Sequence, residues 1–101
     1  MVNYELRHTR KTKKQLRQLK SVPPILRRAV YSFLDALTTD PYLCISKSKR
    51  IAQIGDNCFS KEISRGDRIV YVVVDTSKKV IMLSLFGHYC DNSGKKHMQI
   101  N

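Results

Sequence analysis

Residues 58–86 read CFSKEISRGDRIVYVVVDTSKKVIMLSLF, and the pattern of this stretch decides the fold. Its central part, residues 68–74, is rich in β-branched side chains and predicts a buried central strand. Short segments with the composition of turns separate it from two further strands, which we expect over about residues 58–64 and 80–86. The C-terminal half therefore predicts a sheet of strands that are linked as hairpins.

The chain before this stretch begins with a short strand and a helix. Val2, Tyr4 and Leu6 alternate with polar residues, which predicts a strand with one buried face. Either Thr9 or Thr12 is a suitable N-cap for a helix that continues to about residue 20.

A second helix follows between two prolines. Pro24 is suited to the first position of a helix, and the residue before Pro41 is disfavoured in the helical conformation, so we expect the helix to end there. Apolar residues recur between the two prolines at helical spacing, which predicts a face packed in the core. These residues are Ile25, Leu26, Ala29, Val30, Phe33, Leu34 and Leu37.

The order of the predicted elements indicates the fold class. Residues 45–50 are polar and predict a loop, while Ile51 and Ile54 allow one further short strand near residues 50–54. The order is thus β-α-α-β-β-β. It predicts an α+β fold in which two N-terminal helices pack on one side of a small, mainly antiparallel sheet.

The length of 101 residues predicts a single domain, over residues 1–90, followed by a polar and mobile tail over residues 91–101. The odd number of cysteines, without a C-x-x-C pair, argues against a disulfide framework. No apolar run reaches the roughly 20 residues that a membrane helix needs, and the N-terminus lacks the features of a signal peptide. We therefore expect a cytoplasmic protein with reduced thiols.

The charge of the chain points to the kind of partner. There are 19 Lys and Arg residues against 8 Asp and Glu, which gives a formal net charge of +11. Of the basic residues, 12 lie within residues 1–50. Such an excess favours a polyanionic partner, namely RNA, DNA or an anionic membrane. With 4 glycines and no glycine-rich phosphate-binding motif, we expect no small-molecule cofactor.

Three short segments together resemble a known family. Phe59-Ser60-Lys61-Glu62-Ile63 is followed four residues later by Arg68-Ile69-Val70-Tyr71, and then by Gly87-His88-Tyr89. The joint spacing resembles the second half of the RelE/YoeB (Txe) toxins, in which an aromatic-Ser-Arg-Arg-Ile strand precedes a His-Arg-Leu-Val-Tyr strand and a final His-Tyr pair. The N-terminal half is similar in its strand-helix-helix order.

The resemblance implies the toxin of a type II toxin–antitoxin system that cleaves mRNA in the ribosomal A site. In this reaction the RNA 2′-hydroxyl attacks the adjacent phosphorus and leaves a 2′,3′-cyclic phosphate, without a metal ion. It needs a base for the 2′-OH proton, cations around the phosphorane, and an acid for the departing 5′ oxygen.

The resemblance also assigns roles to three residues. Arg68 would clamp the scissile phosphate, unless it forms only a surface ion pair with Asp67 or Glu62. His88 would be the general acid, for which the ordinary histidine pKa is suited; without a role in the reaction it is an incidental histidine at a strand end. Tyr89 would stack on a base or bond a phosphate oxygen, or it closes the edge of the sheet.

The general base is left open, because the sequence departs from the family pattern. Glu62 stands where the family has its second strand arginine, and Lys49 stands where the YoeB branch has a glutamate. The RelE branch relies on lysines, so Lys47, Lys49 or Lys61 are candidates. Glu62 is the alternative, either as the base or merely as an ion-pair partner of Arg68 or Lys61.

The predicted partners are mRNA, the ribosome and a cognate antitoxin. Basic residues of the first helix and of the loop before residue 51 would bind rRNA phosphates. They are Lys11, Lys13, Lys14, Arg17, Lys20, Lys47 and Arg50. For the helix, the alternative is a solvated surface without a ligand.

Two other functions compete with the toxin interpretation. A non-catalytic relative would keep RNA or antitoxin binding but lack cleavage, and the residues at positions 49 and 62 favour it. A DNA-binding protein is the weaker alternative, because there is no helix-turn-helix spacing and the second helix is too apolar to read a groove.

Overall fold

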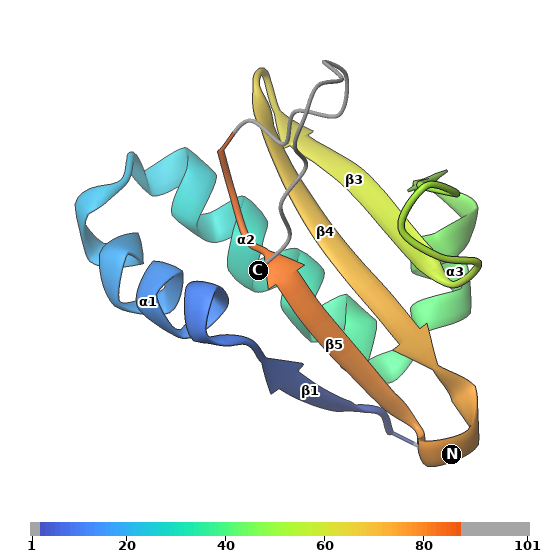
Figure 1. Cartoon of the computed structure of the whole chain (residues 1–101). Coiled ribbons are helices and arrows are strands. Elements are labelled where there is room, and N and C mark those ends of the chain that lie inside the picture. Colours follow the sequence, from blue (N-terminus) through green and yellow to red (C-terminus); the bar gives the residue numbers. More distant parts are fainter. Residues whose placement is uncertain (1–2, 88–101) are drawn as a thin grey trace.

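Strand β4 (Asp67–Val74) lies at the centre of the sheet in the computed structural model, which describes residues 3–87. The sheet has five strands in the order β1-β5-β4-β3-β2 (Figure 1). The neighbours β2–β3, β3–β4 and β4–β5 are antiparallel, and β1 pairs with β5 in parallel. The other strands are β5 (Lys79–Ser84) and β3 (Cys58–Ser64), which flank β4, and the edge strands β1 (Glu5–His8) and β2 (Lys49–Arg50). The predicted α+β class and the mainly antiparallel sheet are confirmed.

Helices α1 (Arg10–Gln18) and α2 (Pro24–Thr39) precede the hairpin strands, as predicted. The N-cap of α1 is Thr9, whose Oγ1 accepts a hydrogen bond from the Thr12 backbone N–H. Pro24 occupies the start of α2, where its missing N–H is not needed. A short 3-10 helix, Leu19–Ser21, joins the two helices.

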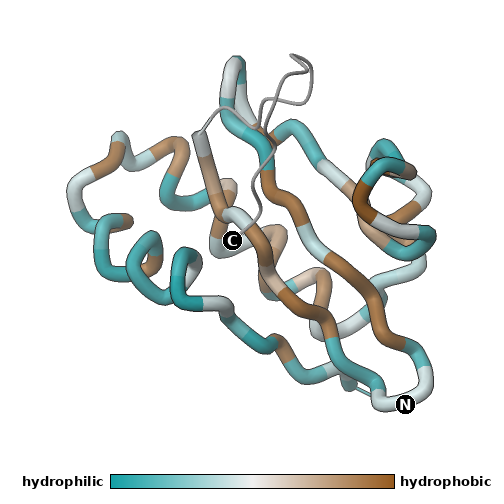
Figure 2. The backbone as a smooth tube through the Cα atoms, in the orientation of Figure 1, coloured by the Kyte–Doolittle hydropathy of each residue, from teal (hydrophilic) through white to brown (hydrophobic). Residues whose placement is uncertain are grey.

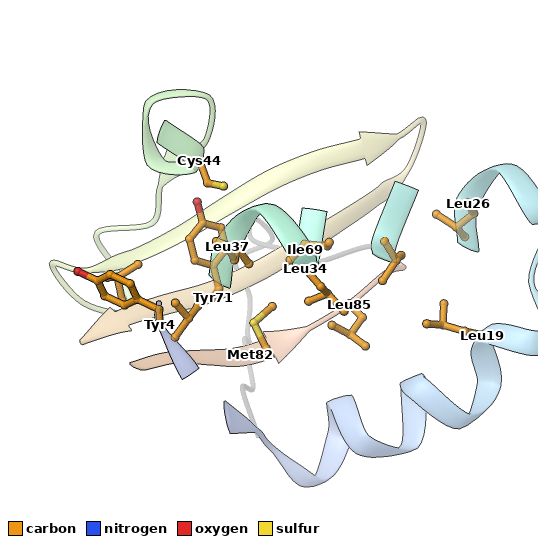
Figure 3. Close-up of a cluster of buried hydrophobic side chains, with 13 residues drawn as sticks. Tyr4, Leu19, Leu26, Leu34, Leu37, Cys44, Ile69, Tyr71, Met82 and Leu85 are labelled. Carbon is orange, nitrogen blue, oxygen red and sulfur yellow. The ribbon is translucent and has the colours of Figure 1, made fainter. Parts of the chain in front are cut away.

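The main core lies between the helices and one face of the sheet (Figure 3). Leu26, Val30, Leu34 and Leu37 of α2 are buried there. They pack with buried residues of the sheet, which include Ile69, Tyr71, Val73, Val80 and Met82. Both predicted helices thus contribute to one side of the sheet, α1 through Leu16 and the adjoining Leu19.

Ile25 is a correction to the predicted core stripe, because its side chain is 72% exposed. At about 100° per residue, Ile25 lies roughly 135° around the helix from the centre of the buried stripe. Ala29 and Phe33 lie at the margin of the stripe and are half-buried. The spacing predicted the helix correctly, but the buried face that it predicted is wider than the one in the structure.

A third helix, α3 (Pro41–Ser46), was not predicted. Pro41 ends α2 as expected, but it also begins α3, and the Asp40 carboxylate caps the new helix by accepting a hydrogen bond from Leu43 N–H at 3.2 Å. The loop prediction for residues 45–50 was therefore wrong in part. The extra strand exists as β2, but it ends at Arg50 instead of including Ile51 and Ile54.

The end of β5 also differs from the prediction, because pairing stops at Ser84 instead of residue 86. After Ser84, the side-chain amide of Gln15, on α1, forms hydrogen bonds with the backbone of the next two residues. Its Oε1 accepts from Leu85 N–H at 2.7 Å, and its Nε2 donates to the Phe86 carbonyl at 3.1 Å.

None of the helices described between residues 3 and 87 is long and apolar enough to cross a membrane.

Candidate functional site

An open hollow of about 720 Å³ lies at the edge of β3. Strand β2 pairs with Phe59 and Ser60, so the remainder of β3 extends beyond it. Five cationic side chains and one carboxylate line the hollow together with serines and Ile63. The charged residues are Lys47, Lys49, Lys61, Arg65, Arg68 and Glu62. The structure thus brings together five residues predicted from three separate segments of the chain, namely Lys47, Lys49, Lys61, Glu62 and Arg68, and adds Arg65, which was not predicted.

Arg68 is held in this hollow by two neighbours on β3. Its Nε donates a hydrogen bond to Ser60 Oγ at 2.6 Å, and its Nη1 lies 3.5 Å from Glu62 Oε1. Glu62 and Arg68 are direct cross-strand partners, so their side chains share one face of the sheet. The Arg68 side chain is 29% exposed, which leaves its guanidinium accessible from the hollow.

Of the two acidic partners considered for Arg68, the structure shows Glu62. The Asp67 carboxylate instead accepts hydrogen bonds from Ser64 and Gly87. The interpretation of Glu62 as an ion-pair partner is therefore confirmed, and this does not conflict with a role as a base.

The lysines enter the hollow from different sides. Lys49 lies directly opposite Ser60 in the β2–β3 pair, so it shares the face on which Ser60 contacts Arg68. Lys61 and Glu62 also line a second hollow of about 330 Å³ between β3 and α2. Lys61 consequently lies at the rim of the first hollow, between the two.

A buried tyrosine anchors the segment that carries Lys47 and Lys49. The Ser48 hydroxyl donates to the Cys44 carbonyl at 2.8 Å, and the Tyr71 hydroxyl lies 2.7 Å from Ser48 Oγ. Because the Ser48 proton is used on Cys44, Tyr71 must be the donor to Ser48. Burial raises the pKa of Tyr71 to about 12, which keeps this donor protonated at neutral pH. In Figure 3 the Tyr71 hydroxyl points towards Cys44.

Gly87 is the last residue that the structure describes, and it lies beside Arg68. The Arg68 backbone N–H donates to the Gly87 carbonyl at 3.2 Å, and Asp67 Oδ1 accepts from the Gly87 N–H at 2.8 Å. The predicted site residues His88 and Tyr89 lie outside the described residues, as does the predicted tail over residues 91–101.

The predicted RNA-binding residues form two groups. Those of α1 and the following turn are all exposed, and α1 has no acidic residue in its sequence. Figure 2 shows the hydrophilic character of α1, which lies beside β5 and away from α3. This α1 group contains Lys11, Lys13, Lys14, Arg17 and Lys20. Lys47 and Arg50 form the second group, at the edge of the sheet that β2 forms. There Arg50 lies 3.5 Å from the exposed Asp56.

Sequence reasoning did not identify Ser60, Asp67 or Tyr71 as parts of the site. The alternation of β3 would have placed Ser60 on the same face as Glu62, and this signal was available. The contacts of Asp67 and Tyr71 depend on segments 20 and 23 residues away, which no local pattern reveals. Within residues 3–87, no group of three or more His, Cys, Asp or Glu side chains is arranged to hold a metal ion.

The chain matches no family model and no curated protein sequence. Solved structures do match. A chain of the toxin–antitoxin complex RelBE2 from Mycobacterium tuberculosis has a TM-score of 0.61 at 25% identity, over 86% of this chain and 99% of that chain. The YoeB/ParE toxin from Agrobacterium tumefaciens has a TM-score of 0.72 at 14% identity, over 84% and 99% of the two chains. The YoeB dimer from Staphylococcus aureus gives 0.70 at 16% identity, over 87% and 100%.

Proposed function

We propose that this chain, which has the fold of the RelE and YoeB toxins, is the toxin of a type II toxin–antitoxin system. We further propose that it is a metal-independent endoribonuclease that cleaves mRNA on the ribosome. The fold and the cationic hollow at the edge of β3 support both statements. Its place of action would then be the cytoplasm, where translating ribosomes are found.

The observation that carries the proposal is the fixed position of Arg68 among other cations. Ser60 and Glu62 hold two of its nitrogens, while the guanidinium remains accessible from the hollow. An RNA phosphate in the hollow would accept hydrogen bonds from Arg68, and nearby lysines would add positive charge around the phosphorane. Groups that are held in place before the reaction stabilise developing charge without having to reorganise.

Two classes of residue are available to accept the 2′-OH proton. Glu62 has a half-exposed carboxylate beside Arg68, and Lys49 and Lys61 line the same hollow. The geometry is compatible with either class, so substitutions have to decide between them. We favour the lysines, because catalysis by clustered cations is the mode of the RelE branch that the sequence resembles.

His88 is proposed to protonate the departing 5′ oxygen, and Tyr89 to contact a base or a phosphate oxygen. Support for this comes from Gly87, which is covalently bonded to His88 and is held beside Arg68 through both of its backbone polar groups. The acid would thus follow directly in the chain after a residue that is fixed at the phosphate clamp.

The proposed partners follow from charge and from the solved complexes. The exposed cations of α1, together with Lys47 and Arg50, would contact rRNA phosphates. The matching Mycobacterium tuberculosis chain comes from a toxin–antitoxin complex, which supports a cognate antitoxin for this chain as well.

A non-catalytic relative is the second candidate, and the contact between Glu62 and Arg68 favours it. A carboxylate beside the proposed clamp competes with a phosphate for the guanidinium. In that case the protein would keep its RNA and antitoxin surfaces but would not cleave.

Inducible expression in bacterial cells distinguishes these candidates. We expect the wild-type chain to arrest growth, and Arg68→Ala to relieve the arrest at equal protein level. Arg28→Ala is the matched control, because Arg28 is an exposed arginine on α2 that does not line the hollow. Normal growth with the folded wild-type protein would contradict the toxin proposal and would support a non-catalytic relative.

A further inference from the structure

The Asp67 carboxylate joins two segments of the chain next to the proposed phosphate clamp. It begins β4 directly after the turn that follows Ser64. Its Oδ2 accepts a hydrogen bond from the Ser64 hydroxyl at 2.8 Å, and its Oδ1 accepts from the Gly87 backbone N–H at 2.8 Å. Both oxygens are therefore occupied, and among the described residues the ion pair of Arg68 is with Glu62 instead.

Gly87 is consequently held from two sides by consecutive residues of β4. Asp67 binds its N–H, and the Arg68 backbone N–H donates to its carbonyl at 3.2 Å. Gly87 has a φ of +94°, a conformation that glycine adopts without strain. A Cβ built at Gly87 would meet no atom within 4 Å, so the backbone conformation and not a lack of space requires the glycine.

We propose that Asp67 is a positioning residue for RNA cleavage, which fixes Gly87 so that the Gly87 carbonyl holds the backbone N–H of Arg68. This inference rests on the proposed function, in which Arg68 clamps the phosphate. A charged acceptor makes a shorter and stronger hydrogen bond to a backbone N–H than a neutral one. Such fixation matters because small displacements of a reacting group reduce the rate strongly.

The test uses the full chain, purified ribosomes and a translated mRNA, with cleavage rates measured over a range of ribosome concentrations. We expect Asp67→Ala to lower kcat by about 10²-fold. KM should stay unchanged, because Asp67 does not line the hollow proposed to bind the RNA. A general loss of folded protein would instead appear in the melting temperature.

Two further variants separate positioning from a merely structural role. In Asp67→Asn, Oδ1 can still accept from the Gly87 N–H while Nδ2 donates to Ser64 Oγ, so we expect most of the activity to return. Asp35→Ala is the control, because it removes an exposed carboxylate on α2 that does not line the hollow, so we expect kcat close to wild type. If Asp67→Ala does not fold, Asp67→Glu keeps the charge but displaces it by one methylene, and it should also lower kcat.

Wild-type kcat in a folded Asp67→Ala or Asp67→Glu variant would overturn this inference. An equal loss in Asp35→Ala, or a loss in Asp67→Asn as large as in Asp67→Ala, would also overturn it. Absence of cleavage by the wild-type chain would overturn the proposed function together with this inference, whereas cleavage that does not depend on residue 67 overturns the inference alone.

Discussion

Arg68 is the residue on which the proposed chemistry depends most directly. Its side chain contacts Ser60 and Glu62 of β3, and its backbone N–H contacts Gly87, so two separate parts of the chain fix one arginine. A guanidinium oriented in this way can present its remaining N–H groups to a phosphate. Lysine has neither the planar shape nor the number of donors needed to replace it.

We therefore expect both Arg68→Ala and Arg68→Lys to lower the rate of mRNA cleavage, by about 10²-fold or more for alanine. His88→Ala should lower the rate of mRNA cleavage by about 10²–10⁴-fold, as is typical for the loss of a positioned acid. Primer extension on a translated mRNA measures these rates, and circular dichroism confirms the fold of each variant. Wild-type rates in both alanine variants would show that the site has been assigned incorrectly.

The general base is tested by three single substitutions. If a lysine accepts the 2′-OH proton, Lys49→Ala or Lys61→Ala should abolish cleavage, and Glu62→Gln should be mild. If Glu62 is the base, Glu62→Gln should remove cleavage and leave ribosome affinity unchanged. A carboxylate base would also place the rising limb of the pH–rate profile at acidic pH, whereas a lysine would place it higher. Full activity in all three variants would exclude each of them as an essential base.

At the level of elements, Lys47 directly follows α3 and Lys49 lies in β2, and this part of the chain is anchored at two points. Tyr71 of β4 donates to Ser48, in the segment between α3 and β2. At the start of α3, Tyr42 donates to Asp75 Oδ1 at 2.6 Å, and Tyr4 donates to the same oxygen at 2.6 Å. These contacts connect α3 and the residues after it to the central strand β4 and to Asp75, which directly follows β4.

Tyr71→Phe removes the donor to Ser48 without changing the aromatic packing against Phe33 and Phe59. The expected loss in the free energy of unfolding is about 1 kcal/mol, the usual contribution of one hydrogen bond. Because Ser48 lies between Lys47 and Lys49, cleavage should also fall. Urea unfolding and primer extension measure the two effects, and unchanged cleavage would show that this contact does not position the lysines.

Asp75 gives the fold an acid-sensitive contact. Hydrogen bonds from Tyr4, Tyr42 and Lys78 lower the pKa of Asp75 to about 2, from an ordinary value of 3.8. Because the folded pKa is below the unfolded one, the stabilisation is present above the unfolded pKa and is lost as pH falls through the folded pKa. Asp75→Asn should therefore be destabilised near neutral pH, with a difference from wild type that shrinks between about pH 4 and pH 2. A constant difference in melting temperature across that range would contradict this account.

These elements also show what the sequence could and could not predict. Strands β3 and β4 and helix α2 followed from local patterns, because alternation, β-branched runs and proline positions act within a few residues. Helix α3 was missed because Pro41 was interpreted only as the end of α2, although Asp40 and Pro41 also form a helix start. The end of β5 is determined by Gln15, about 70 residues away in the chain, and no local pattern contains that information.

Like the fold, the candidate site could be predicted from the sequence only in part. Arg68 and Glu62 share a face because their strands pair in the register that the turn between them imposes. The hydrogen bonds of Asp67 to Gly87 and of Tyr71 to Ser48 arise only when distant segments pack together. Sequence patterns thus singled out Lys47, Lys49, Lys61, Glu62 and Arg68 but not Arg65, and the structure added the residues that hold them.

For the whole molecule, the +11 net charge predicts that the proposed association with ribosomes depends on salt. Replacing Lys13, Lys14 and Arg17 by glutamine together should reduce the slope of log affinity against log salt by about three, one for each lost phosphate contact. Arg28→Gln is the single-charge control and should leave the slope unchanged. Equal slopes for the triple variant and wild type would show that α1 does not face rRNA.

The activity proposed for this chain is cleavage of mRNA on the ribosome, and primer extension on one mRNA with and without ribosomes is the decisive test. We predict discrete cuts within the translated region that require both ribosomes and wild-type protein. Cleavage should continue in the presence of EDTA at concentrations that leave the ribosomes intact. The cuts should disappear when Arg68→Ala replaces the wild-type protein. Equal cleavage of the free mRNA would contradict the dependence on the ribosome. The absence of cuts with folded wild-type protein bound to translating ribosomes would contradict the proposed cleavage activity itself.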